Sequence, residues 1–294
     1  MNWKAYRLTF RLQSPLHIGS HNVGNLLHTR YYVPARTIWG AFVAQLTRLQ
    51  GPQSHSQVKD QVNQAARFSY CYPICERDKP EKALYPCFNP DTQRMVFGKE
   101  GMSQEMFEGH FLASYASTAL DPFQASAEDG SLHEVECLTP AVQQDGMGKH
   151  VSLCGYLFLK IEQEELYHNF KRVLDRLQLG GERAYGFGKV SGTLEPVRSK
   201  ERFFGLYEFD LSDAACPLIR FAEASVPPIV LAHTSITGIP QALGDIEPVV
   251  GRKWVDSSRK YGLTKAKICW TPGSVLSETD QVFEIREQGI WHAR

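Results

Sequence analysis

Long apolar runs are absent from this sequence. None approaches the roughly 18 residues that a membrane-spanning helix needs, so no membrane partner is expected. The 294 residues include seven cysteines, an odd number that does not suit a secreted disulfide framework. Because no secretory leader is recognisable either, we predict a globular cytoplasmic protein.

Acidic residues are missing from the first 59 positions, since the first one is Asp60. The net charge is nevertheless zero, with 32 Lys and Arg against 32 Asp and Glu, because residues 76–165 are rich in carboxylates. A neutral total argues against a protein that coats nucleic acid non-specifically. Charge segregated in this way suits a polyanion on one face and a protein neighbour on another. The cations of the first part are Lys4, Arg7, Arg11, Arg30, Arg36, Arg48 and Lys59.

Nucleotide-binding motifs are also lacking. Neither GxGxxG after a strand nor GxxxxGK followed by Ser or Thr occurs, so no cofactor is expected. The chain has instead a loop that contains Gly180, Gly181, Gly186 and Gly188. Glycine takes a positive φ at little steric cost, and a run of exposed amides forms a concavity for an anion such as a phosphate. The structural alternative is that Gly180 caps the preceding helix while Gly186 and Gly188 mark a bulge.

Residue periodicity predicts two helices among several strands. Apolar spacings from Ile38 to Leu49 describe a helix with Thr37 as its N-cap, and a second helix is expected at 166–177. Residues 20–31 are expected to form a polar loop, residues 52–65 a loop or weak helix, and residues 79–109 an irregular segment. Alternating patterns predict strands at 6–12, 67–74, 115–120, 131–138, 151–161 and 187–194.

The order strand, helix, strands, helix, strand is that of a ferredoxin-like (RRM-like) α+β domain with a long insertion before the second helix. Helices would cover one face of its sheet. The other face would stay free, as in the RNA-recognition-motif domains that bind single-stranded RNA there. From Phe203 onward strand patterns dominate. We place a boundary near Ser199, between a domain at 1–199 and a part at 200–294 that is either β-rich or a degenerate second ferredoxin-like domain.

Several cations are candidates for binding phosphates, because guanidinium forks match phosphate oxygens. Arg183 lies inside the glycine-rich loop, and Arg36 lies at the start of the first helix, where the dipole favours an anion. For Arg252 the competing explanation is a buried carboxylate partner. The basic candidates together are Arg30, Arg36, Arg183, Lys189, Arg252 and Lys253.

Cys71, Cys75 and Cys87 raise the question of a metal. Their C-x3-C-x11-C spacing lacks the paired CxxC of strong zinc sites, and a fourth ligand would have to come from elsewhere. The alternative is that they are small buried hydrophobic residues. We expect no metal.

Four stretches, in the order in which they occur, resemble the RAMP superfamily, the repeat-associated proteins of CRISPR effector complexes. The last of them is most similar to the subgroup that caps the 5′ end of the guide RNA in type III complexes. The stretches are SPLHIG at 14–19 with YVP at 32–34 leading into a helix with Gly40, the hairpin-like region at 117–136, the glycine-rich loop at 180–190, and GRKW at 251–254 with WTPGSV at 270–275.

This resemblance implies a subunit that binds CRISPR RNA (crRNA) through backbone contacts of the glycine-rich loop and through the basic first helix. A long segment follows the loop, as in the capping subgroup, which holds the repeat-derived 5′ handle. The implied partners are crRNA, the large polymerase-like subunit and the first RAMP backbone subunit, with target RNA contacted only indirectly. Antiviral defence is the implied role.

Catalysis is not the first expectation. Backbone subunits of type III complexes cut target RNA with an Asp in the loop after the first strand, and residues 20–31 contain no carboxylate that could hold a metal. His28 and His21 do lie there, and imidazole can move protons without metal. His28 is therefore a candidate RNA contact, a candidate catalyst of a metal-independent endoribonuclease that processes precursor crRNA, or an ordinary loop histidine. A third possibility is an RNA-free scaffold, which the neutral charge favours and the glycine-rich loop disfavours.

Overall fold

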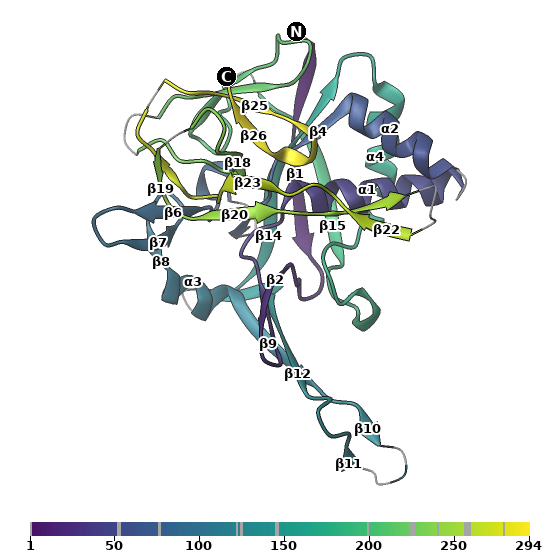
Figure 1. The fold of residues 1–294 in the computed structure, drawn as a ribbon. Helices are drawn as coiled ribbons and strands as arrows, with labels where there is room; N and C mark the ends of the chain where they lie inside the picture. The colour runs from purple at the N-terminus through teal and green to yellow at the C-terminus, as the bar shows by residue number, and fades with distance from the viewer. Residues whose placement is uncertain are drawn as a thin grey trace.

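The computed structural model describes residues 2–294 apart from 52–53, 76–77, 122, 124–125, 145–146, 199, 224–226, 240, 256–259 and 279. An antiparallel sheet forms the centre of the N-terminal part (Figure 1), and its strands run in the order β13-β14-β1-β15, with β4 and β5 also paired to β14. These strands are β1 (Trp3–Leu12), β4 (Ala66–Phe68), β5 (Tyr72–Cys75), β13 (Ala141–Gln144), β14 (Met147–Lys160) and β15 (Val190–Pro196).

The sheet has ferredoxin-like topology. If β4 and β5 count as one interrupted strand, its spatial order is fourth, first, third, second, and every neighbouring pair is antiparallel. Helix α1 (Ala35–Gln50) joins the first two strands and α4 (Glu164–Val173) joins the last two. The long insertion falls between β5 and β14. The predicted α+β, ferredoxin-like class is therefore confirmed.

Both crossover helices pack on one face of the sheet. The ring of Phe42 on α1 lies 5.5 Å from that of Phe68 on β4 and 4.7 Å from that of Phe170 on α4. Helix α2 (His55–Ala65) packs beside α1, where a loop or weak helix was predicted. The prediction of Thr37 as N-cap is wrong. The helix begins at Ala35 after Pro34, because the extended backbone of Pro34 already sets the entry and its carbonyl accepts the Thr37 amide.

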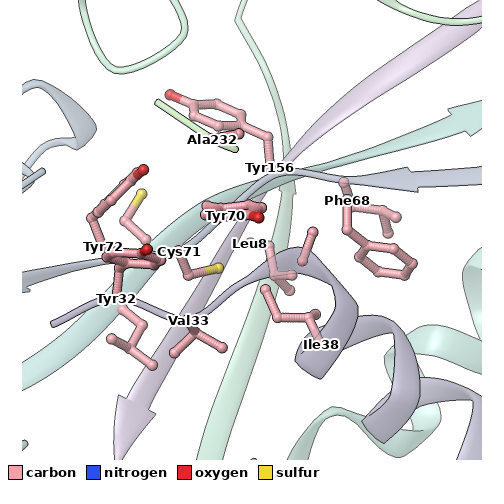
Figure 2. Packing of buried hydrophobic residues seen from close by; sticks show 14 of the residues in the cluster. Leu8, Tyr32, Val33, Ile38, Phe68, Tyr70, Cys71, Tyr72, Tyr156 and Ala232 are labelled. Atoms are coloured by element: carbon pink, nitrogen blue, oxygen red, sulfur yellow. The ribbon is translucent and has the colours of Figure 1, made fainter. Parts of the chain in front are cut away.

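The other face of the sheet is not free. Tyr72 on β5 donates its hydroxyl to the carbonyl of Leu231 at 2.6 Å, and the ring of Tyr156 on β14 lies 4.8 Å from that of Phe203. Figure 2 shows Tyr156 and Ala232 of the C-terminal part within one cluster of buried residues, whereas Phe68 packs on Phe42 of α1. The expectation of an open, RNA-binding sheet face is wrong, because the C-terminal part buries its own apolar residues there.

The C-terminal part is strand-rich, and within its described residues no α-helix occurs. One hydrophobic core contains residues from both sides of position 199. Ser199 itself lies outside the described residues, so the domain boundary stays a prediction. The main sheet comprises β16 (Tyr207–Asp210), β17 (Leu218–Phe221), β25 (Val282–Ile285), β26 (Trp291–Ala293), β18 (Thr234–Ser235), β23 (Lys267–Trp270) and β20 (Ile246–Val249); two-stranded pairs are β19 (Ala242–Leu243) with β24 (Val275–Leu276) and β21 (Arg252–Val255) with β22 (Lys260–Leu263).

Two segments predicted to lack regular structure are ordered strands and a helix. Residues 20–31 form most of a hairpin, and this hairpin joins a sheet of order β2-β3-β12-β9. Residues 79–109 contain a three-stranded sheet and the start of α3. The elements are β2 (Gly19–Val23), β3 (Leu26–Thr29), β6 (Pro86–Asn89), β7 (Arg94–Phe97), β8 (Met102–Ser103), α3 (Gln104–Phe111), β9 (Leu112–Ser117), β10 (Leu120–Asp121), β11 (Ser126–Ala127) and β12 (His133–Leu138).

Candidate nucleic-acid interface

The glycine-rich loop, residues 180–189, docks on the segment that links β1 to β2. The amide of Gly181 donates to the His17 carbonyl at 2.9 Å, and the amide of Gly188 donates to the Pro15 carbonyl at 2.7 Å. Gly180 has φ +75°, and a Cβ there would lie 2.1 Å from the His17 carbonyl oxygen. Glycine is required at this position because any side chain would separate the two segments.

The amides of three loop glycines, Gly181, Gly186 and Gly188, are engaged within the protein, which corrects the predicted anion concavity at these positions. Besides the bonds of Gly181 and Gly188, the amide of Gly186 donates to the Arg183 carbonyl at 3.0 Å. Gly180 is not a helix cap either. Helix α4 ends at Val173 and a short 3₁₀ turn, Leu174–Arg176, follows it. These glycines therefore shape the loop, and contacts to an anion would come from its side chains.

A small hydrophobic cluster fastens the loop to the neighbouring sheet. Phe187 is buried against Val135 and Cys137 of β12. Its ring lies 6.1 Å from that of Tyr115 on β9, in an edge-to-face arrangement. The loop is thus held from two sides, by the β1–β2 link and by β12.

Three side chains of the loop are exposed in a way that suits a single-stranded nucleic acid. Arg183 donates its Nε–H to the Gly180 carbonyl at 2.9 Å, which orients an otherwise exposed guanidinium. Lys189 is exposed, and its amide is fixed by the hydroxyl of Ser14 at 2.9 Å. Tyr185 is 68% exposed. Sequence reasoning missed Tyr185, although an aromatic residue between Gly181 and Gly186 was a usable signal.

His28 lies on β3 and has partners that its sequence context did not reveal. Its ring stacks on that of His21 with centroids 4.7 Å apart, and its Nδ1 lies 3.4 Å from a carboxylate oxygen of Glu136 on β12. The same oxygen accepts the amide of Thr29 at 2.8 Å. The hairpin itself carries no carboxylate, but the fold brings one to it from residue 136.

Arg30 is committed to an ion pair inside the protein. Its two terminal nitrogens lie 2.9 and 3.3 Å from the carboxylate oxygens of Glu247 on β20, and it also donates to the hydroxyl of Tyr32 at 3.0 Å. Burial alone would lower the pKa of Arg30, but Tyr32 and Glu247 outweigh that effect and raise it. His233 completes the group by donating Nε2–H to Glu247 while Nδ1 accepts the hydroxyl of Tyr70 at 2.6 Å. This arrangement favours a structural role for Arg30, joining the two parts of the chain.

Arg36 also contacts the C-terminal part. Its guanidinium donates to the side chain of Gln288 and to the carbonyl of Arg252, and burial lowers its pKa. Arg252 itself is exposed on β21. The contacts of the described residues include no carboxylate partner for it, which was the alternative considered in the sequence analysis. The side chain of Lys253 lies outside the described part of the structure. In Figure 1 the β21–β22 pair lies apart from the glycine-rich loop, so these cations form a second location.

The three candidate cysteines do not form a metal centre. No group of three or more His, Cys, Asp or Glu side chains able to hold a metal occurs among the described residues. Cys71 is fully buried, and burial raises the pKa of its thiol well above the ordinary value. Burial likewise raises the pKa of Cys87 to about 11 and that of Cys75 above its ordinary value. Protonated thiols packed in this way behave as small hydrophobic residues.

Comparison with known proteins assigns the family. Residues 9–191, more than half of the chain, match the family model described as the RAMP superfamily. The chain belongs to the RAMP superfamily. No curated protein sequence matches it. In the described residues no helix is long and apolar enough to cross a membrane.

One solved structure shares the fold of this RAMP chain. One chain of the Type III-B Cmr-beta complex bound to cognate target RNA and AMPPnP, determined by cryo-EM, is 10% identical with a TM-score of 0.53, and the match covers 92% of this chain and 85% of that one. A chain of the same type of complex in the apo state is 11% identical with a TM-score of 0.41, and the match covers 67% of this chain and 98% of that one. At 10% identity the first of these two likenesses shows the fold alone.

Proposed function

We propose that this RAMP protein is a non-catalytic subunit of a type III CRISPR effector complex and that it holds the repeat-derived 5′ handle of the crRNA. The observation that carries the proposal is the glycine-rich loop, which is fastened on two sides and presents Arg183, Tyr185 and Lys189 to solvent. Superfamily membership supports it, as does the fold shared with a chain of an RNA-bound Cmr-beta complex.

The chemistry of the loop suits RNA whose bases are unpaired. Arg183 and Lys189 would contact phosphates, because cations are the main source of affinity for a polyanion. Tyr185 would stack on a base, which is worth about 1–3 kcal/mol in single-strand binders. The fastened backbone favours binding, since little loop freedom would be lost on association. Arg252 and Lys253 would serve a second stretch of the same RNA.

The proposed neighbours are the large polymerase-like subunit and the first RAMP backbone subunit. Target RNA would be contacted only through the crRNA. In this reading the chain needs no cofactor, because its task is to position RNA. These partners imply that the protein acts in the cytoplasm, where such complexes meet foreign RNA.

A second candidate is favoured by one observation, the stacked pair His21 and His28 beside Glu136. Two imidazoles can act as general base and general acid in cleavage by the RNA's own 2′-hydroxyl, without a metal. One would accept the proton of the attacking hydroxyl and the other would protonate the leaving oxygen. The chain would then be an endoribonuclease that processes precursor crRNA. An RNA-free scaffold is the remaining alternative.

The test of these alternatives is to incubate the purified protein, in EDTA, with end-labelled RNA that contains the cognate repeat. The same samples are run on native and denaturing gels. Intact RNA that shifts only when the 5′ handle is present supports capping. Cleavage that is lost in His28→Ala would refute it in favour of the nuclease, and no shift at all would leave the scaffold.

Gly186 allows a matched pair of variants in this assay. A Cβ at Gly186 meets no atom within 4 Å, but φ is +89°, so Gly186→Asp and Gly186→Asn share the same backbone strain and nearly the same size. They differ by one negative charge. At roughly 6 Å from a phosphate in water that charge costs about 0.7 kcal/mol, or about threefold in affinity. We expect Gly186→Asp to bind handle RNA at least about threefold more weakly than Gly186→Asn. Equal affinities would contradict RNA contact at this loop.

Lys189→Ala tests the phosphate contact through its salt dependence. Loss of one phosphate contact should weaken binding to all handle sequences alike and lower the slope of log affinity against log salt by about 1. Arg220→Ala is the control, because Arg220 is exposed on β17 in the C-terminal sheet. If both variants lower the slope equally, attraction by overall charge would account for the binding.

A further inference from the structure

A cavity of about 280 Å³ lies at one end of the central sheet, where β1 begins and β14 ends. The glycine-rich loop docks beyond the other end of β1, which runs away from the N-terminus marked in Figure 1. Leu12 at that end lies eight positions after Lys4, or about 27 Å along an extended strand. The cavity is therefore separate from the loop. Its polar lining residues include Lys4, Tyr6, Glu162, Glu164, Tyr167 and His168.

Tyr6 brings to this cavity a hydroxyl that the fold does not satisfy. Its side chain is only 9% exposed, and its ring stacks on that of Tyr167 on α4 with centroids 4.8 Å apart. Within the described part of the chain its hydroxyl has no hydrogen-bond partner. Burial, Tyr167 and the carboxylate of Glu164 raise the pKa of Tyr6, so the hydroxyl stays neutral and can donate or accept. Since the polar groups of buried side chains are normally hydrogen-bonded, this one points to a ligand.

Charged groups of both signs line the cavity without neutralising one another. Lys4, Glu162 and Glu164 are exposed, and the ion pairs formed among the described residues include none of the three. Lys160 also lines the cavity, but its ammonium lies over the ring of Trp3, 5.6 Å from the ring centroid. A simple anion would meet two carboxylates here, and a simple cation would meet Lys4. A ligand that carries both an ammonium and a carboxylate complements both signs.

The rest of the lining limits the size and polarity of the ligand. Leu159 of β14 and Pro196 of β15 add apolar surface, and Pro196 lies opposite Tyr6 in the β1–β15 pairing. A volume of about 280 Å³ would hold roughly nine water molecules. It is therefore large enough for an amino acid with an apolar side chain or for a dipeptide, and too small for a large cofactor.

We propose that this cavity binds a small zwitterion of the amino-acid class, either a free amino acid with an apolar side chain or a dipeptide. The ammonium of the ligand pairs with Glu162 and Glu164, and its carboxylate pairs with Lys4. The hydroxyl of Tyr6 hydrogen-bonds to one of these two ligand groups, and the apolar part packs on Leu159. The inference does not rest on RNA binding, because the cavity and the glycine-rich loop lie at opposite ends of β1.

Titration calorimetry of the full chain with probes that share a phenyl group tests the two charges. L-phenylalanine carries both, phenethylamine carries only the ammonium, and 3-phenylpropionate carries only the carboxylate. Glycyl-L-phenylalanine places the two charges further apart, so its affinity relative to L-phenylalanine distinguishes a dipeptide site from an amino-acid site. The better zwitterion should bind at least about tenfold more tightly than either singly charged probe, because each of those lacks one charged hydrogen bond.

Substitutions assign each charge to its residue. Glu164→Gln should lower the affinity for the zwitterion about tenfold and remove its advantage over 3-phenylpropionate, whereas Lys4→Gln should remove its advantage over phenethylamine. Tyr6→Phe deletes only the unpartnered hydroxyl, so it should weaken zwitterion binding about tenfold without lowering the melting temperature. Glu165→Gln is the matched control, because Glu165 is the exposed neighbour of Glu164 and does not line the cavity.

Three results would overturn the proposal: no binding of either zwitterion, equal affinities for the zwitterions and the singly charged probes, or zwitterion binding that is the same in wild type, Tyr6→Phe and Glu164→Gln. Handle RNA run on native gels should shift equally with wild type and Tyr6→Phe. A wild-type protein that binds the zwitterion but no handle RNA would count against the proposed function and leave this site standing.

Discussion

Replacing Glu247 with Gln should destabilise the folded protein, because it weakens the contact between the N-terminal and C-terminal parts of the chain. Glu247 accepts two hydrogen bonds from Arg30 and one from His233, and these residues come from distant parts of the sequence. Burial alone would raise the pKa of Glu247, but the bonds from His233 and Arg30 outweigh that effect and lower it from 4.5 to about 2. The carboxylate form is thus strongly preferred in the folded protein.

The size of the pKa shift of Glu247 sets the stability that should be lost in the variant. A folded pKa of about 2 against 4.5 corresponds to about 3 kcal/mol at pH 7, from 1.36 kcal/mol per pKa unit. Because the Glu247 side chain is 28% exposed, we expect about 2–3 kcal/mol for Glu247→Gln. The folded pKa lies below the unfolded one, so the contribution is present above about pH 4.5 and is lost as the pH falls toward 2. At pH 3.5 about two fifths of it should be gone.

Urea unfolding at pH 7 and at about pH 3.5 measures both quantities. The free energy of unfolding of the wild-type protein should exceed that of Glu247→Gln by about 2–3 kcal/mol at pH 7. This difference should narrow by about 1 kcal/mol at the lower pH. Burial lowers the pKa of His233 and Glu247 raises it, so the loss of Glu247 also changes the titration of His233; the same comparison made in a His233→Gln background removes this contribution. Glu208→Gln, an exposed carboxylate beside Arg202, should change stability by less than about 0.5 kcal/mol.

Two results would refute this reasoning. A gap that is the same at both pH values would mean that the charge of Glu247 does not carry the effect. Equal free energies of unfolding at pH 7 would mean that Glu247 does not hold Arg30 in solution. Arg30 would then be a candidate RNA contact again.

Two further predictions concern the glycine-rich loop. Gly188→Ala should destabilise the protein by about 2–4 kcal/mol, because φ is +76° and a Cβ would lie 1.9 Å from the Leu179 carbonyl oxygen; urea unfolding checks this, and a cost no larger than that of Gly186→Ala would contradict the close approach. Phe187→Ala should cost about 3 kcal/mol by emptying the cluster with Val135. Hydrogen exchange should then accelerate in the loop, and unchanged exchange would mean that the β1–β2 link alone holds it.

Local patterns in the sequence were sufficient for the elements that repeat with a regular period. The first strand alternates at period 2, and both crossover helices carry apolar stripes, so their types and order could be predicted. The hairpin at β2 and β3 escaped notice because every residue of β2 is exposed, which leaves no alternation to detect. Its pairing with β12 depends on residues more than a hundred positions away.

Tertiary structure alone decided which candidate groups are available to RNA. Arg30 and Arg183 look equivalent as sequence, yet the fold places Glu247 against the first and leaves the second exposed. Likewise the fold places Glu136 beside His28, and the amides of Gly181 and Gly188 donate to carbonyls of the β1–β2 link. The physical reason is that the contacts of a side chain depend on packing between residues far apart in the sequence. The periodicity of a strand or helix depends only on neighbouring residues. The sequence by itself determined the family-level architecture and the position of the glycine-rich loop, and the tertiary structure determined what that loop can offer a ligand.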